Sequence, residues 1–196
     1  MGIAALMGNV GRVMAWWSRI AWRPVLAYAI PGMPAAALGA HTLLTIPQAV
    51  VEGALAVFFV AMIALRRTAA ITRWRFTIWH IAAAGAVVGF LTGIVFSTGP
   101  LSVPISTAYG LTGGAFLGTE AASSLLLYVG KLATFGAAGA LTEAVIIRGV
   151  VIGGALMFGS IAARHVVERI DLHNYQALID VVLAIGAVTM IPAILR

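Results

Sequence analysis

The stretch GFLTGIVFSTGPLSVPISTAYG, residues 89–110, decides how the chain folds. It carries no charge and resembles a membrane helix until Thr98-Gly99-Pro100 interrupts it. Proline lacks the N–H that a helix needs and glycine permits a turn, so the helix is predicted to break there. In lipid, a break survives only where protein or water satisfies its backbone groups. Residues 81–110 are therefore predicted to form a helix, a break and a short second helix, all buried against the next span.

The rest of the chain is as apolar as this stretch. Its 196 residues are 62% hydrophobic and only 9% charged, with a mean hydropathy of +1.05, whereas soluble domains carry roughly 25% charged residues. Charge-free runs such as 24–51 and 76–119 are long enough to cross a bilayer. The composition excludes a soluble domain and predicts an all-α, polytopic membrane protein whose partner is the lipid bilayer.

Several kinds of chemistry find no support in the sequence. The chain has no cysteine, which excludes disulfides, iron–sulfur clusters and thiol chemistry. The net charge of +6 comes largely from arginines between apolar runs, which indicate membrane topology rather than binding to nucleic acid. The histidines show no metal-ligand spacing, and no nucleophile–base pair or phosphate loop is present. We therefore expect neither an enzyme nor a cofactor-binding protein, and no metal site.

The arginines predict how the chain crosses the membrane. The apolar piece 101–110 is too short to cross alone, so it belongs to a broken or re-entrant segment. Arginines concentrate in the second connection, and the positive-inside rule then places residues 66–76, the 139–143 turn and Arg196 in the cytoplasm. About six transmembrane helices are predicted, at 24–45, 48–65, 77–98, 115–138, 144–164 and 174–195.

Two pairs of segments indicate an internal repeat. QAVVEG at 48–53 matches QALIDV at 176–181, since both give Gln-Ala, two aliphatic residues and an acid. GNVGRVMAW at 8–16 matches LYVGKLATF at 127–135, where Val-Gly-Arg corresponds to Val-Gly-Lys. The two matches occur in the same order, so we interpret them as copies of one membrane unit.

The repeat sets the expected organisation of the chain. Residues 81–119 have no earlier counterpart, so residues 1–75 are predicted to be the remainder of a first membrane repeat that lacks its start. Residues 76–196 are predicted to be a complete second repeat, and the two form one integral membrane domain. An intact protein is expected to have eight spans in two halves. Four spans per half is an even number, which predicts parallel copies.

Two cations lie within apolar segments at equivalent positions of the repeat. Arg12 and Lys131 each follow Val-Gly. A cation inside a membrane segment is costly and is a functional candidate by default. A pseudosymmetric site would present both cations to a shared cavity and bind an anion. The alternative is that Lys131 extends its stem to the membrane interface.

The interrupted segment supplies the other candidate binding groups. Discontinuous helices place free N–H groups near the midplane, where they attract anions. The candidates beside the break are Ser97, Thr98, Gly99, Pro100 and Ser102. The alternative is a tight loop at the membrane surface followed by an ordinary helix.

Other residues of these spans have less specific interpretations. Glu120 could accept a coupling proton, pair with Lys131, or lie at the external surface, and we expect the surface placement. Gly85, Gly89 and Gly93 recur every four residues and are predicted to form a helix-packing stripe.

Four segments in order resemble the sulfite exporter TauE/SafE family. They are WRPVLAYAIPGMPAAALGAHTLL at 22–44, ALAVFFVAMIALRR at 54–67, GFLTGIVFSTGPLSVP at 89–104 and GTEAASSLLLYVGKLATF at 118–135. The resemblance implies a multi-pass permease of a bacterial-type cell membrane. It also implies that the partner is a small sulfur-containing anion: sulfite, a sulfonate or a related organosulfur anion.

A second hypothesis comes from a different class of protein. The glycine stripe and the shortened first repeat are also typical of a non-transporting membrane subunit or scaffold that packs against a partner. A homo-oligomer is compatible with either hypothesis.

Overall fold

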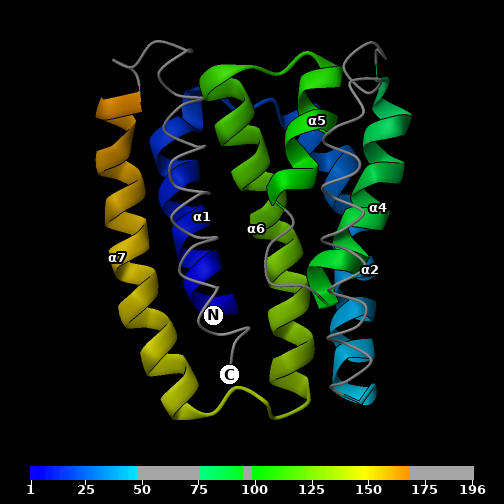
Figure 1. Ribbon diagram of the computed structural model, residues 1–196, viewed down its shortest axis with the longest axis vertical. Helices are drawn as coiled ribbons and strands as arrows, with labels where there is room; N and C mark the ends of the chain where they lie inside the picture. Colours follow the sequence, from blue (N-terminus) through cyan, green and yellow to red (C-terminus); the bar gives the residue numbers. More distant parts are fainter. Residues whose placement is uncertain (48–75, 95–98, 168–196) are drawn as a thin grey trace, which may run out of the picture. The chain divides into compact units, whose positions relative to one another are not determined.

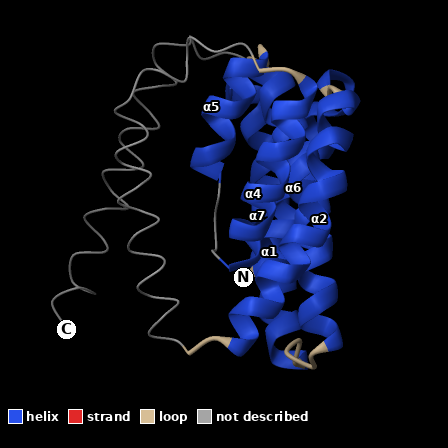
Figure 2. Ribbon diagram, turned by 90° about the vertical axis from the view of Figure 1, so that its right-hand side faces the viewer, coloured by secondary structure: helices blue, strands red, loops and turns tan. Residues whose placement is uncertain are grey.

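The structure is a computed structural model that describes residues 1–47, 76–94 and 99–167, and every regular element in those ranges is helical (Figure 2). The predicted all-α class is confirmed. The predicted spans 48–65 and 174–195 lie outside the described residues. The contacts reported below lie within one compact unit, residues 1–160. The elements (Figure 1) are α1 (Gly2–Trp16), the 3-10 helix η1 (Trp17–Arg19), α2 (Trp22–Thr45), α4 (Ile78–Ile94), α5 (Gly99–Tyr109), α6 (Gly113–Ala137) and α7 (Glu143–Val167).

The interrupted segment is present, but its Gly-Pro pair plays a different part from the one predicted. Helix α4 ends at Ile94 and α5 begins at Gly99. Pro100 is therefore the second residue of α5, where its missing N–H costs nothing because the first N–H groups of a helix have no intrahelical acceptor. Gly99 and Pro100 begin a helix instead of breaking one. The predicted interruption is confirmed, since α4 and α5 are separate helices, and Thr98 lies outside the described residues.

Helix α5 returns to the end of the bundle where α4 began. The backbone N–H of Phe76 donates to the carbonyl of Ala108 at 3.0 Å, which ties the start of α4 to the end of α5. The two helices also pack against each other (Figure 1). With 17 residues, α4 is about 25 Å long, shorter than the span predicted at 77–98. The segment is re-entrant.

The glycine stripe holds α4 against α2, as predicted. A Cβ atom at Gly85 would lie 2.8 Å from the Cα of Tyr28, and one at Gly89 would lie 2.8 Å from the Cα of Gly32. Gly93 repeats this contact one turn further along both helices. Because the contacts advance together, α2 and α4 run in the same direction with their backbones almost touching.

Helix α6 packs between α1 and α2. Its Gly130 lies against the backbone of Met33 in α2, and its Thr119 hydroxyl accepts a 3.0 Å hydrogen bond from the N–H of Ala21, just before α2 begins. These contacts make α6 parallel to α2. The largest buried cluster joins α2, α4 and α6 and consists of Tyr28, Ala36, Ile81, Val88 and Leu127.

Helix α1 runs opposite to α6. Gly2 lies against Leu132 near the end of α6, whereas Trp16 lies against Gly114 near its start. Segments 8–16 and 127–135, the two predicted copies, therefore run in opposite directions.

Helix α7 completes an inverted arrangement. Gly149 lies against Ile3 and Gly153 against Met7, so α7 runs parallel to α1 just as α2 runs parallel to α6. The described segments of the predicted copies therefore run in opposite directions, which differs from the predicted parallel arrangement. The repeat itself and its bounds stay a prediction.

The directions of the helices also differ from the predicted topology. Phe76 lies at the end of the bundle where α2 begins, because α4 is parallel to α2. The 138–142 turn lies at the end where α2 finishes, because α6 is also parallel to α2. In this turn Gly139 adopts a φ of +68°, which side chains other than glycine rarely tolerate. Residue 76 and the turn at 139–143 had been predicted to lie on the same side of the membrane. The structure places them on opposite sides.

The helices differ in how apolar they are. Among the described residues, one helix, Glu143–His165 of α7, is both long enough and apolar enough to cross a bilayer, with a mean hydropathy of 2.0. Helices α2 and α6 have 24 and 25 residues, a sufficient length. In α6 the buried side chains include Thr119, Glu120, Ser123 and Lys131, which lower its hydropathy while facing other helices rather than lipid.

Candidate functional site

The two predicted cations do not share a cavity. Arg12 meets α6 at Glu120, whereas Lys131 lies eleven residues further along the same helix. At a rise of 1.5 Å per residue, this separation is about 16 Å. Arg12 contacts the first half of α6, whereas Lys131 lies in its second half.

Lys131 is turned into the bundle. Its side chain is only 5% exposed, and its Nζ donates a 2.8 Å hydrogen bond to the carbonyl of Thr92. The ammonium also lies 5.7 Å from the ring centre of Phe135. Thr92 is near the C-terminal end of α4, and the negative end of a helix dipole is favourable for a cation. The alternative in which Lys131 extends to the interface is therefore wrong.

An open cavity of about 260 Å³ adjoins Lys131. Of the described residues that line it, Lys131 provides the only charged side chain. The walls are mainly apolar and aromatic and include Leu43, Tyr128, Leu132 and Leu141. Ile94, the last residue of α4, also lines it, so the cavity reaches the point where α4 stops.

Such a cavity suits a small anion. The Lys131 ammonium, in surroundings of low dielectric, attracts a negative charge strongly, and Met1, the amino-terminal residue, also lines the cavity. The arrangement offers no nucleophile and no base, and within the described ranges no group of three metal-ligating side chains occurs.

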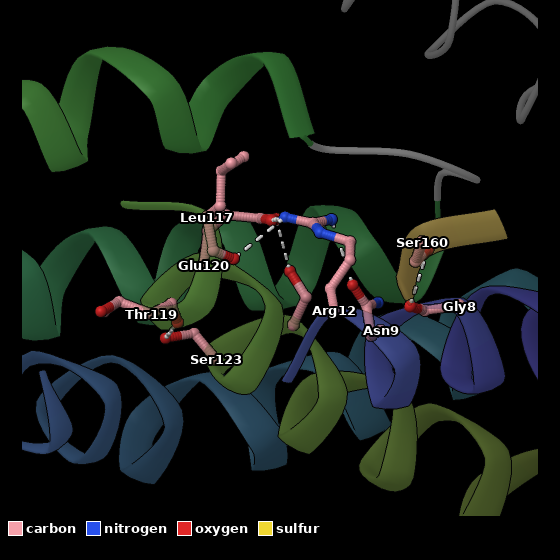
Figure 3. Close-up of polar contacts among 9 residues, drawn as sticks. Gly8, Asn9, Arg12, Leu117, Thr119, Glu120, Ser123 and Ser160 are labelled. Carbon is pink, nitrogen blue, oxygen red and sulfur yellow. Dashed lines mark hydrogen bonds and ion pairs between the residues drawn. The ribbon is translucent and has the colours of Figure 1, made fainter. Parts of the chain in front are cut away.

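Glu120 forms the second polar centre, shown in Figure 3. Its carboxylate makes an ion pair with Arg12 and accepts a 2.8 Å hydrogen bond from the Ser124 hydroxyl. The guanidinium of Arg12 also donates to the carbonyl of Leu117 and to the side-chain oxygen of Asn9, each at 3.3 Å. Glu120 is 9% exposed because α1 covers this side of α6. Its predicted surface placement is wrong, and the residue it pairs with is Arg12, on another helix, instead of Lys131.

A small polar cavity lies on the other side of Glu120. Its volume is about 20 Å³, room for roughly one water molecule. Hydroxyl groups from three helices line it: Tyr28 from α2, Ser102 and Ser106 from α5, and Ser123 from α6. Tyr28 and Ser102 share a side-chain hydrogen bond.

The predicted binding residues are thus divided between two places. Ser102 lies with Glu120 in the small cavity, away from Lys131. Gly99 and Pro100 form the start of α5, and Ser97 and Thr98 lie outside the described residues.

Two residues of the Glu120 centre were not predicted. Ser124 stands four residues after Glu120, a spacing that places both on one face of a helix and could have indicated the contact. Tyr28 gives no such signal, because its place beside Glu120 depends on how α2 packs against α5 and α6.

Comparison with known proteins gives one informative result. The family model described as Sulfite exporter TauE/SafE matches residues 1–190. No curated protein and no solved structure matches the chain.

Proposed function

Since the chain belongs to the sulfite exporter TauE/SafE family, a family of membrane permeases, we propose that it carries sulfite or a small organic sulfonate across a bacterial-type cytoplasmic membrane. We further propose that it is multi-pass and that the anion binds in the cavity beside Lys131. The family match supports transport of an anion, and the cavity supports this location for the binding step.

The observation that carries the proposal is the burial of Lys131 beside an apolar cavity. A buried ammonium is stabilised by the acceptors and negative charge that surround it, and the Thr92 carbonyl is one such acceptor. An entering sulfite or sulfonate would supply a full charge and oxygen acceptors for the same ammonium. The apolar wall would at the same time exclude water, which would otherwise compete with the anion for the Lys131 ammonium.

Lys131 has two separable roles that variants can distinguish. Lys131→Gln retains a donor for the Thr92 carbonyl but loses the charge, and Lys131→Met loses both. If the charge binds the anion, both variants should reduce flux by about 10- to 100-fold, the equivalent of one hydrogen bond to a charged group. Lys131→Arg should keep part of the activity.

Flux of labelled sulfite into proteoliposomes measures these effects. Val129→Met is the matched control, because Val129 is on the same helix but 44% exposed, and it should transport normally. Normal flux in Lys131→Gln together with loss in Lys131→Met would show that the lysine only caps α4. Absence of saturable flux in the unmodified protein would favour the scaffold hypothesis instead.

A further inference from the structure

Glu120 lies between a cation and a polar cavity, and the two sides differ in accessibility. The Arg12 side chain is 32% exposed, whereas the Glu120 side chain is 8% exposed. The guanidinium is therefore partly open at the surface of the described helices, whereas the carboxylate is closed off. The titratable groups that face Glu120 in the described residues are Arg12 from α1, Tyr28 from α2 and Tyr128 from α6 itself, while α4 and α5 contribute none.

We propose that Arg12 and Glu120 form an exchange pair that couples anion transport to a proton. In the empty state the guanidinium binds the Glu120 carboxylate. In the loaded state, a step of the transport cycle distinct from binding in the cavity beside Lys131, the guanidinium holds the passing anion, and Glu120 takes up one proton from water and becomes a neutral carboxyl group. This inference rests on the proposed function and adds the coupling ion to it.

The charge balance of the site requires the proton. The empty pair has no net charge. If an anion displaced the carboxylate without protonation, Glu120 would be left buried and charged with no cation beside it, which is strongly unfavourable. Protonation returns the total to zero, so one proton accompanies each monovalent anion.

The small cavity provides the groups that a neutral carboxyl needs. Ser124 already donates to the Glu120 carboxylate at 2.8 Å, and its hydroxyl can rotate to accept instead. On the cavity side, the Ser102 and Tyr28 hydroxyls and one water molecule would form a short hydrogen-bonded chain along which a proton can move. The carboxylate therefore has a partner in each protonation state.

The experiment uses the full chain in liposomes that contain a pH-sensitive dye, with methanesulfonate as the probe because it stays ionised throughout the working range. The unmodified protein should take up one proton per methanesulfonate and accumulate it when a pH gradient is applied. Glu120→Gln has the shape of the protonated side chain. It should lose gradient-driven accumulation, and its methanesulfonate counterflow should become independent of pH.

Glu143→Gln is the matched control, because this carboxylate at the exposed start of α7 is outside both centres. It should behave as the unmodified protein does. Gradient-driven accumulation in Glu120→Gln would overturn the inference. Saturable methanesulfonate flux without proton uptake in the unmodified protein would also overturn it, whether or not the variant folds. Absence of saturable flux of both methanesulfonate and sulfite would instead overturn the proposed function, and the inference with it.

Discussion

The contact between α2 and α4 leaves no room for a methyl group at Gly89. A Cβ atom there would lie 2.8 Å from both the Cα and the carbonyl carbon of Gly32, and closer still to its oxygen. Ordinary contact begins at 3.4 Å. Because the obstructing atoms are backbone, no side chain can rotate away, and the two helices would have to separate by about 1 Å to bring the Gly32 oxygen into ordinary contact.

The expected cost follows from this separation. A gap of that size forfeits about half of the dispersion energy at each affected contact, and overpacking typically costs about 1–3 kcal/mol. Alanine recovers about 1 kcal/mol through its better helix propensity. Gly89→Ala should therefore lower the free energy of unfolding by up to about 2 kcal/mol. Gly154→Ala, where no atom lies within 4 Å, should instead raise it by up to about 1 kcal/mol.

Unfolding by SDS titration in mixed micelles, followed by helical circular dichroism, compares the two variants with the parent chain. The pair is matched, because each adds one methyl group to a helical glycine. If Gly89→Ala proved as stable as Gly154→Ala, the close contact between α2 and α4 would be incorrect, and with it the direction assigned to α4.

Two further predictions test the ends of the bundle. The chain has no native cysteine, so single cysteines can be placed at Thr77, Thr112 and Ala140. Those at Thr77 and Thr112 should react with an impermeant reagent from one side of the membrane, and the one at Ala140 from the other side. Labelling of Thr77 and Thr112 from opposite sides would refute the re-entrant segment. Thr119→Val should lower the free energy of unfolding by about 1–3 kcal/mol, because the Ala21 N–H loses its acceptor. The control Thr112→Val should change it little, since the Thr112 side chain makes no capping hydrogen bond. Equal thermal midpoints for the two variants would contradict the predicted loss of stability in Thr119→Val.

The sequence predicted those features that arise from local patterns. Composition predicted the all-α fold, the four-residue spacing predicted the packing of Gly85, Gly89 and Gly93, and the Gly-Pro pair predicted an interruption near residue 99. A local pattern, however, cannot show whether the chain continues across the membrane after an interruption or turns back. That depends on the contact between Phe76 and Ala108, which are 32 residues apart and carry no complementary side chains.

The candidate site was predicted in part for the same reason. Arg12, Lys131 and Glu120 could be selected because charge is rare in apolar helices. Their partners could not be selected, since Arg12 and Glu120 are separated by 108 residues and meet only because α1 runs opposite to α6. Once the re-entrant segment was counted as a crossing, the predicted direction of every later helix was reversed. Glu120 was expected at the surface because its cover by α1 cannot be read from local sequence.

The hydrogen bond between Lys131 and Thr92 has a consequence for how the protein is made. The donor is encoded 39 residues after its acceptor, which corresponds to roughly 2–8 s of synthesis at ordinary ribosome speeds. During that interval α2 is already complete and can hold α4 through the glycine stripe. The Thr92 carbonyl, however, gains the Lys131 ammonium only when α6 enters the membrane. Assembly of the re-entrant segment is therefore finished only when a later helix arrives, and a ribosome stalled before codon 131 would leave it incomplete.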